Sequence, residues 1–141
     1  SLTMPNGGKF KFIYYNVIDN ILINSVVDAQ QEAFRRAAQQ AGINPRSVFY
    51  VEAHATGTKV GDPIEANSIG EVFGGERSDI LRVGSVKSNV GHLECASFMA
   101  GLIKATLMLD KGCLVPNINF ETPNPDIKWD EHVSQPSTLF G

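Results

Sequence analysis

The chain has 141 residues, of which 43% are hydrophobic and 19% are charged, and its formal net charge is −3. This length suits one globular core, and the scattered basic residues argue against a nucleic-acid partner. The two cysteines, Cys95 and Cys113, are too few for the disulfide framework of a small secreted domain, so we expect a reducing, cytoplasmic setting. The longest apolar run, residues 96–109, contains Lys104 and is too short to cross a bilayer. We therefore expect no membrane partner and no secretory leader.

The stretch from Lys9 to Val27 has an unusual composition. Between Lys9 and Asn24, five residue types (Phe, Lys, Ile, Tyr and Asn) fill 13 of 16 positions, with neither a two-residue nor a helical period. These amino acids are those of A/T-rich codons, so we interpret residues 9–27 as a retained-intron segment. The alternative is a genuine surface insertion that forms a hairpin, and the sequence of the mature transcript would distinguish the two.

The first regular element is a predicted amphipathic helix over residues 28–41. Asp28 stands where a capping residue belongs, apolar residues gather on one side, and Gly42 follows the end. Residues 48–53, VFYVEA, are β-branched and aromatic over the length of a strand. This predicts a strand that leads directly into His54.

Helices and strands continue to alternate after this point. Asp62, followed by proline, predicts the start of a second helix that runs to about Phe73, and residues 80–86 predict a second strand. Residues 93–111 predict a helix that is apolar on nearly every face and must be packed on several sides. Residues 114–120 are expected to form a last strand. The alternation predicts a layered α/β fold.

Two histidines, His54 and His92, each follow a predicted strand. Loops at strand ends are where α/β folds gather their reactive groups. If the two strands are neighbours, both imidazoles can reach one pocket, where two N–H donors aimed at one oxygen would stabilise a developing enolate or alkoxide. The alternative for each histidine is a buried ring with satisfied hydrogen bonds.

Polar residues surround both histidines. The loop from Ala55 to Asp62 offers hydroxyls and close backbone approach, which suit a ligand bearing an amide or a phosphate, although a plain turn between strand and helix is the alternative. Lys87 and Glu94 flank His92. We interpret them mainly as a pair that fixes the loop, with polarisation of a substrate by the lysine as the alternative.

Metal binding and cysteine catalysis are both disfavoured. His92 and Glu94 do not have the spacing of three or four residues that helical metal sites use, and no cysteine pair is available, so we expect no metal. Cys95 lacks an adjacent base at a defined geometry, and we interpret it as a small packed core residue. Cys113, after a glycine, has still less to suggest a role.

Two long segments resemble the two histidine motifs of β-ketoacyl synthase domains, especially those of modular or iterative type I polyketide synthases. They are VEAHATGTKVGDPIEANSIGEVFG, residues 51–74, and VGSVKSNVGHLE, residues 83–94. The resemblance extends through AGLIKATLMLDKG and LVPNINFETPNPDIKW, covers most of the chain outside residues 9–27, and thins after Trp129. It implies a partial thiolase-like fold, a layered α/β/α arrangement that is an incomplete C-terminal half.

The resemblance also implies a reaction. Members of this family catalyse decarboxylative Claisen condensation of an acyl thioester with malonyl-acyl carrier protein. By resemblance, His54 and His92 are the catalytic pair that promotes decarboxylation and holds the thioester oxygen as charge builds there.

Other positions receive supporting roles from the same resemblance. Thr56 and Thr58 match residues that contact the phosphopantetheine arm, and Lys87 and Glu94 match the polar pair that supports the second histidine. Phosphopantetheine arrives on the acyl carrier protein, so no cofactor is expected to bind the chain directly.

The chain departs from the family pattern in three places. The cysteine-serine-rich motif that carries the family's nucleophile is absent, and neither Cys95 nor Cys113 matches it. Ala55 stands where the family usually has glycine, and Phe98 stands where it usually has a small residue. We therefore interpret residues 1–141 as a fragment of a ketosynthase domain that is inactive alone.

Partners follow from this interpretation. They are the acyl carrier protein, the rest of the ketosynthase domain, the other synthase domains and, in the full enzyme, a second copy in a homodimer. Two alternatives stay open: a fatty-acid-type condensing enzyme and a non-catalytic ketosynthase-like partner.

Overall fold

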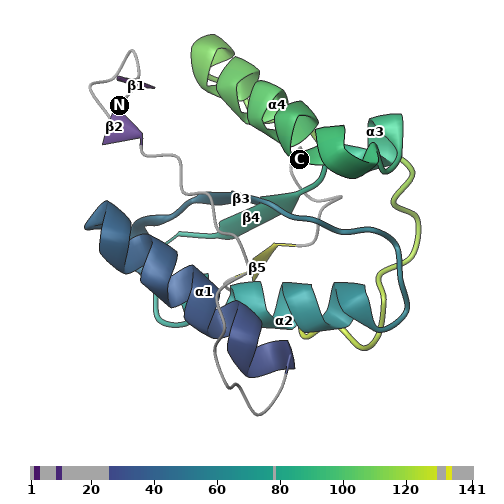
Figure 1. Cartoon of the computed structure of the whole chain (residues 1–141), viewed down its shortest axis with the longest axis horizontal. Coiled ribbons are helices and arrows are strands. Elements are labelled where there is room, and N and C mark those ends of the chain that lie inside the picture. The colour runs from purple at the N-terminus through teal and green to yellow at the C-terminus, as the bar shows by residue number, and fades with distance from the viewer. Residues whose placement is uncertain (1, 4–8, 11–25, 78, 130–132, 135–141) are drawn as a thin grey trace.

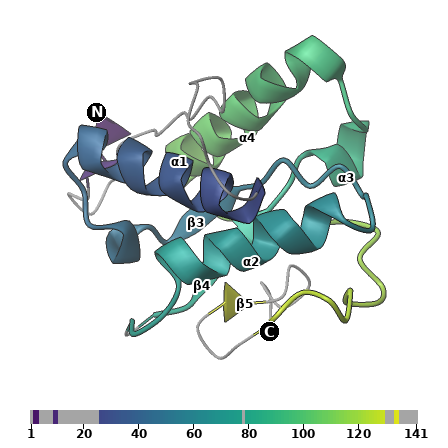
Figure 2. The same ribbon diagram turned by 60° about the horizontal axis from the view of Figure 1, so that its bottom comes forward.

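The computed structural model describes residues 2–3, 9–10, 26–77, 79–129 and 133–134. It places a small parallel sheet between two helical layers, with α1 and α2 on one face and α3 and α4 on the other (Figures 1 and 2). In chain order the elements are β1 Leu2–Thr3, β2 Lys9–Phe10, α1 Val26–Ala41, β3 Tyr50–Glu52, α2 Gly61–Phe73, β4 Leu81–Gly84, α3 Lys87–Val90, α4 Ser97–Lys111 and β5 Val133–Ser134, with 3-10 turns at Pro45–Ser47 and Glu94–Ala96. The chain therefore has the α/β class that its sequence predicts.

The sheet has the order β3-β4-β5 and its strands are parallel. Strands β3 and β4 pair with Tyr50 opposite Arg82 and Glu52 opposite Gly84. A Cβ atom at Gly84 would lie 2.5 Å from the hydroxyl oxygen of Tyr50, so the strand needs glycine there for the close approach. Because parallel strands run in the same direction, β3 and β4 end at the same edge of the sheet.

The core lies between the sheet and the layer of α1 and α2. Phe34 of α1, Ile69 of α2 and Leu81 of β4 are almost completely buried. The rings of Phe34 and Phe73 have centroids 5.3 Å apart and are tilted, so α1 and α2 contact each other through aromatic side chains. The apolar face predicted for the first helix is the face that packs here.

The predicted helix 28–41 is confirmed, but α1 begins at Val26. Asp28 therefore lies in the first turn, where its negative charge faces the positive end of the helix dipole, and it is not the cap that the sequence suggested. Of the segment 9–27, only Lys9–Phe10 and the start of α1 lie within the described residues. The interpretation of this segment as an intron or as a hairpin insertion otherwise lies outside them.

The single helix predicted for residues 93–111 is wrong in its first part. Glu94 has a positive φ angle of 49°, which a continuous helix cannot contain. Residues Glu94–Ala96 instead form a 3-10 turn, and α4 begins at Ser97. His92 lies in the loop before this turn, outside the helix, as the sequence predicts.

Within the described residues, α4 is not covered on all the sides that its apolar sequence predicts to be packed. Met99, Ile103 and Leu107 of α4 are each more than half exposed, although they lie four residues apart on one apolar face.

No helix in the described part of the chain is both long and apolar enough to cross a membrane.

The strand predicted for residues 114–120 does not form; the third strand is β5, which pairs with β4. Pro116 lacks the N–H that a strand interior would donate. The side chain of Asn117 instead satisfies the end of β4, since its oxygen accepts from the Ser85 N–H at 2.9 Å and its amide donates to the Val83 carbonyl at 3.3 Å.

A partly buried polar cluster joins α4 to the sheet. The hydroxyl of Tyr50 donates to the carboxylate of Glu52, which also accepts from the Val86 N–H at 2.5 Å. The ammonium of Lys104 lies 3.0 Å from the same carboxylate and 5.7 Å from the centre of the Tyr50 ring. Burial, together with the adjacent Glu52 carboxylate, raises the pKa of the Tyr50 hydroxyl well above its ordinary value.

This raised pKa predicts a loss of stability in alkali. Above pH ~10, Tyr50 of the unfolded chain releases its proton while folded Tyr50 keeps it, so its contribution to the free energy of unfolding falls by about 1.4 kcal/mol per pH unit. Urea-dependent proteolysis of dilute chain from about pH 9 to pH 11 measures this slope. The Tyr50→Phe variant keeps the ring but has no hydroxyl to titrate, so its free energy of unfolding should fall less steeply with pH. Equal slopes for the parent and Tyr50→Phe would contradict the prediction.

Candidate active site

His54 and His92 lie side by side at the edge where β3 and β4 end. Their ring centroids are 5.2 Å apart and the ring planes are 89° to each other. Both residues are exposed, so neither is the buried ring that was the alternative for each. The sequence separates the two histidines by 38 positions, and the parallel pairing of their strands brings them together.

Glu65 fixes the backbone at His54. Its carboxylate, in the first turns of α2, accepts from the N–H groups of His54 at 2.7 Å and Ala55 at 2.8 Å. The residue is only 6% exposed, so these hydrogen bonds compensate for the burial of its charge. Glu65 lies 11 residues after His54 in the sequence, and its role toward His54 is visible only in the tertiary structure.

The loop after His54 is held by its own polar side chains. The carboxylate of Asp62 accepts from the N–H groups of Gly57 at 3.1 Å and Thr58 at 3.3 Å. The Thr58 hydroxyl accepts from the N–H of Gly61, the first residue of α2, at 3.0 Å. Asp62 is therefore not the helix cap that the sequence predicted. It lies inside α2 and reaches back to the loop.

The ring of His92 is oriented through Nδ1. This nitrogen accepts from the N–H of Glu94 at 3.2 Å, and the hydroxyl of Ser97 lies 2.8 Å from it. An amide N–H can only donate, so Nδ1 carries no proton and the neutral ring carries its proton on Nε2. His92 therefore has a free donor to offer a ligand.

Lys87 and Glu94 do not pair with each other. Among the ion pairs of the described residues, none joins these two side chains, so the loop-fixing pair that the sequence favoured is not formed. Both residues line the same pocket as His54. Glu94 contacts His92 through its backbone N–H.

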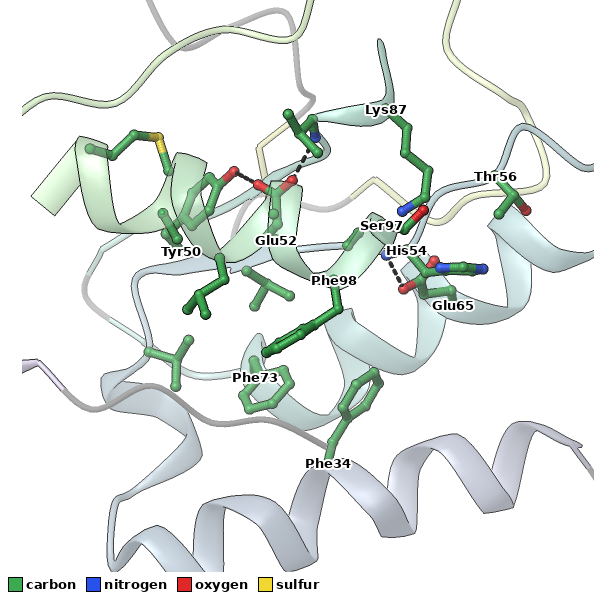
Figure 3. A pocket seen from close by; sticks show the side chains of 18 of the residues that line it. Phe34, Tyr50, Glu52, His54, Thr56, Glu65, Phe73, Lys87, Ser97 and Phe98 are labelled. Carbon is green, nitrogen blue, oxygen red and sulfur yellow. Dashed lines mark hydrogen bonds between the residues drawn. The ribbon is translucent and has the colours of Figure 1, made fainter. Parts of the chain in front are cut away.

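A pocket of about 830 Å³ opens between α4, β3 and α1. His54, Thr56 and Lys87 stand on one side of it, and Phe34, Phe73 and Phe98 stand on the other (Figure 3). Thr58 and His92 do not line it. The pocket thus has a polar side next to His54 and an aromatic side.

The interpretation of Cys95 as a core residue is wrong. Cys95 and Cys113 are both exposed, and both are free. Cys95 lies in the 3-10 turn before α4, outside the helix that was expected to bury it. In the part of the chain that the structure describes, no three His, Cys, Asp or Glu side chains are arranged to hold a metal ion.

Comparison with known proteins decides the family. The family model of the β-ketoacyl synthase C-terminal domain matches residues 17–121, well over half of the chain. The chain belongs to the β-ketoacyl synthase family. The match begins within the segment 9–27, so part of that segment lies in the matched range.

The similar sequences are polyketide synthases. The chain is 57% identical over 104 residues to a hybrid PKS-NRPS synthetase of Aspergillus niger, and 56% identical over 102 residues to a polyketide synthase of Streptomyces halstedii. These matches cover 74% and 72% of the chain but only 3% and 1% of those relatives. The chain thus corresponds to a small part of each synthase, the C-terminal domain of its ketosynthase.

Solved ketosynthases share its fold. Ketosynthase twelve of the bacillaene polyketide synthase of Bacillus amyloliquefaciens superposes with a TM-score of 0.74 at 32% identity, over 89% of this chain and 23% of that one. A ketosynthase from module 6 of the bacillaene synthase of Bacillus subtilis gives a TM-score of 0.71 at 37% identity, over 86% of this chain and 24% of that one. The chain therefore has part of the thiolase-like ketosynthase fold.

Ala55 is strained next to the candidate site. Its φ angle is 38°, a left-handed conformation that costs a residue with a Cβ atom about 1–2 kcal/mol. Ala55→Gly should therefore raise the free energy of unfolding by about 1 kcal/mol, after the extra entropy of glycine in the unfolded chain is subtracted. Urea-dependent proteolysis measures the change. Ala100→Gly in the interior of α4 is the matched control and should lower stability by a similar amount. A fall in stability for Ala55→Gly would contradict the prediction.

Proposed function

We propose that the chain is part of a ketosynthase domain that condenses an acyl thioester with malonyl-acyl carrier protein. The observation that carries this proposal is the pairing of His54 and His92, whose ring centroids are 5.2 Å apart. The proposal requires that one N–H donor of each ring reach the same carbonyl oxygen, and the short distance between the two rings supports it.

The proposed step is decarboxylation followed by carbon–carbon bond formation. The bond from the malonyl α-carbon to its carboxylate breaks, CO2 leaves, and the electron pair moves into the enolate of the thioester. His54 and His92 donate N–H hydrogen bonds to the enolate oxygen. The α-carbon then attacks the acyl thioester carbonyl, and the thiolate that carried the acyl group leaves.

The resemblance to ketosynthases and the positions around the pocket also suggest roles for residues near the two histidines. Thr56 lines the pocket beside His54, and we assign it, with Thr58, to the phosphopantetheine arm of the carrier protein. Lys87 lines the same pocket and supplies positive charge near the reacting carboxylate. Glu94 supports His92 through its backbone N–H. No metal or redox cofactor takes part in this scheme.

The acyl-bearing nucleophile must come from outside these residues, because neither cysteine of the chain matches the family's motif. We therefore propose that residues 1–141 act with the remainder of a ketosynthase domain, that the full enzyme is a homodimer within a larger synthase, and that residues 9–27 are an insertion or a retained-intron segment. Two free cysteines suit the reducing cytoplasm, where we place the enzyme.

One observation favours a second candidate, a non-catalytic ketosynthase-like partner. Phe98 is 47% exposed and lines the pocket with His54, in a position where the family usually has a small residue. A phenyl ring there would crowd a substrate. A fatty-acid-type condensing enzyme is the other alternative, and the polyketide synthases among the relatives weigh against it.

The histidine pair predicts the outcome of mutation in a complete ketosynthase domain that contains this chain. His54→Ala and His92→Ala should each slow release of CO2 from malonyl-acyl carrier protein by about 100- to 1,000-fold, since each removes one donor to the enolate oxygen. Lys111→Ala, at the far end of α4 where the lysine side chain is 70% exposed, is the control and should change the rate less than twofold.

The chain alone should give no ketoacyl product from acyl and malonyl carriers, and formation of product would show that no external nucleophile is needed. Undiminished CO2 release from both histidine variants would overturn the catalytic assignment. A complete domain with no decarboxylation even before mutation would favour the non-catalytic partner.

A further inference from the structure

Ser97 touches the candidate site from an element that the histidine motifs do not include. It is the first residue of α4, its relative exposure is 9%, and its hydroxyl oxygen lies 2.8 Å from Nδ1 of His92. Figure 3 shows it in the pocket wall on the same side as His54. Nothing in the sequence pattern singled out this serine.

The geometry determines which way the hydrogen bond runs. Nδ1 of His92 already accepts from the Glu94 N–H, so the nitrogen carries no proton of its own. A serine hydroxyl can rotate, and here it must donate to Nδ1. Both hydrogen bonds therefore stabilise the tautomer whose proton is on Nε2, which is the donor that the proposed reaction uses.

Of the two hydrogen bonds to Nδ1 of His92, the one from Ser97 is shorter and comes from the better fixed residue. Glu94 is exposed, its φ angle is 49°, and its N–H bond to the ring is the longer one at 3.2 Å. Ser97 is buried at the start of a helix of 15 residues, and Lys104 of that helix is ion-paired at 3.0 Å to Glu52 of β3. Strand β3 leads into His54. Helix α4 therefore contacts His92 through Ser97 and the strand that precedes His54 through Lys104.

We propose that Ser97 is a positioning residue that holds the His92 ring and keeps its proton on Nε2. The effect of Ser97 on the ring is a property of the chain itself. Its effect on rate rests on the proposed ketosynthase function. The two parts can therefore fail separately.

The first test reads the tautomer directly by nuclear magnetic resonance of the chain labelled with ¹⁵N-histidine. In the parent, the His92 ring nitrogens should report the Nε2–H form. Ser97→Ala removes one hydrogen bond and should lower the ratio of the Nε2–H to the Nδ1–H tautomer by about 2- to 10-fold. Ser97→Thr keeps a hydroxyl and should restore the parent ratio, while the signals of His54 stay unchanged.

Ser88→Ala is the matched control, because the Ser88 hydroxyl donates to the Ser85 carbonyl at 3.1 Å in the neighbouring helix α3. It should leave the His92 signals as they are. If Ser97→Ala folds poorly, Ser97→Cys has a similar volume and a weaker donor, and it should give an intermediate ratio. An unchanged tautomer ratio in the folded Ser97→Ala or Ser97→Cys variant would overturn the proposal.

The second test uses the complete ketosynthase domain. Ser97→Ala should lower kcat for decarboxylation of malonyl-acyl carrier protein by about the same 2- to 10-fold and leave KM nearly unchanged, because the ground-state contacts of the substrate remain. A shifted tautomer with an unchanged kcat would overturn the positioning role. If the tautomer shifts but the complete domain shows no decarboxylation at all, the role of Ser97 in holding the His92 ring is supported. The proposed ketosynthase function is then refuted.

Discussion

Strands β3 and β4 pair in parallel with Glu52 opposite Gly84, and the candidate site depends on this register. Because both strands run the same way, the segments that follow them leave the same edge of the sheet, and the His54 and His92 rings meet there. A shift of one residue would turn Glu52 and Tyr50 away from α4, since successive side chains of a strand point to opposite faces. Gly84 admits the Tyr50 hydroxyl and so helps to set the register.

Two carboxylates, the buried Glu65 and the partly buried Glu52, secure the elements around this edge. Glu65 accepts the N–H groups of His54 and Ala55, and Glu52 accepts the Val86 N–H while it pairs with Lys104. A buried carboxylate is costly unless it is fully paired, and each of these has at least two partners. These two carboxylates hold the two histidine segments and α4 in one arrangement. The stability of the fold and the candidate chemistry therefore depend on the same side chains.

The exposed apolar face of α4 agrees with the part of a ketosynthase that this chain represents. Met99, Ile103 and Leu107 repeat every four residues, a pattern that normally faces other protein, yet each is more than half exposed. The chain spans 23% of ketosynthase twelve of the bacillaene synthase and a few per cent of its curated relatives. A helix that is apolar on most sides is expected in a domain larger than the part described.

The sequence by itself determined the α/β class, the amphipathic helix 28–41, the two strands that precede His54 and His92, and the resemblance to ketosynthases, because these depend on local periodicity and on residues close in the chain. Only the tertiary structure decided the rest. Residues far apart in the chain form the contacts of Glu65 with His54 and of Asn117 with β4, and no local pattern encodes them. The same holds for the break at Glu94, where a positive φ angle accompanies the turn that brings Ser97 to the His92 ring.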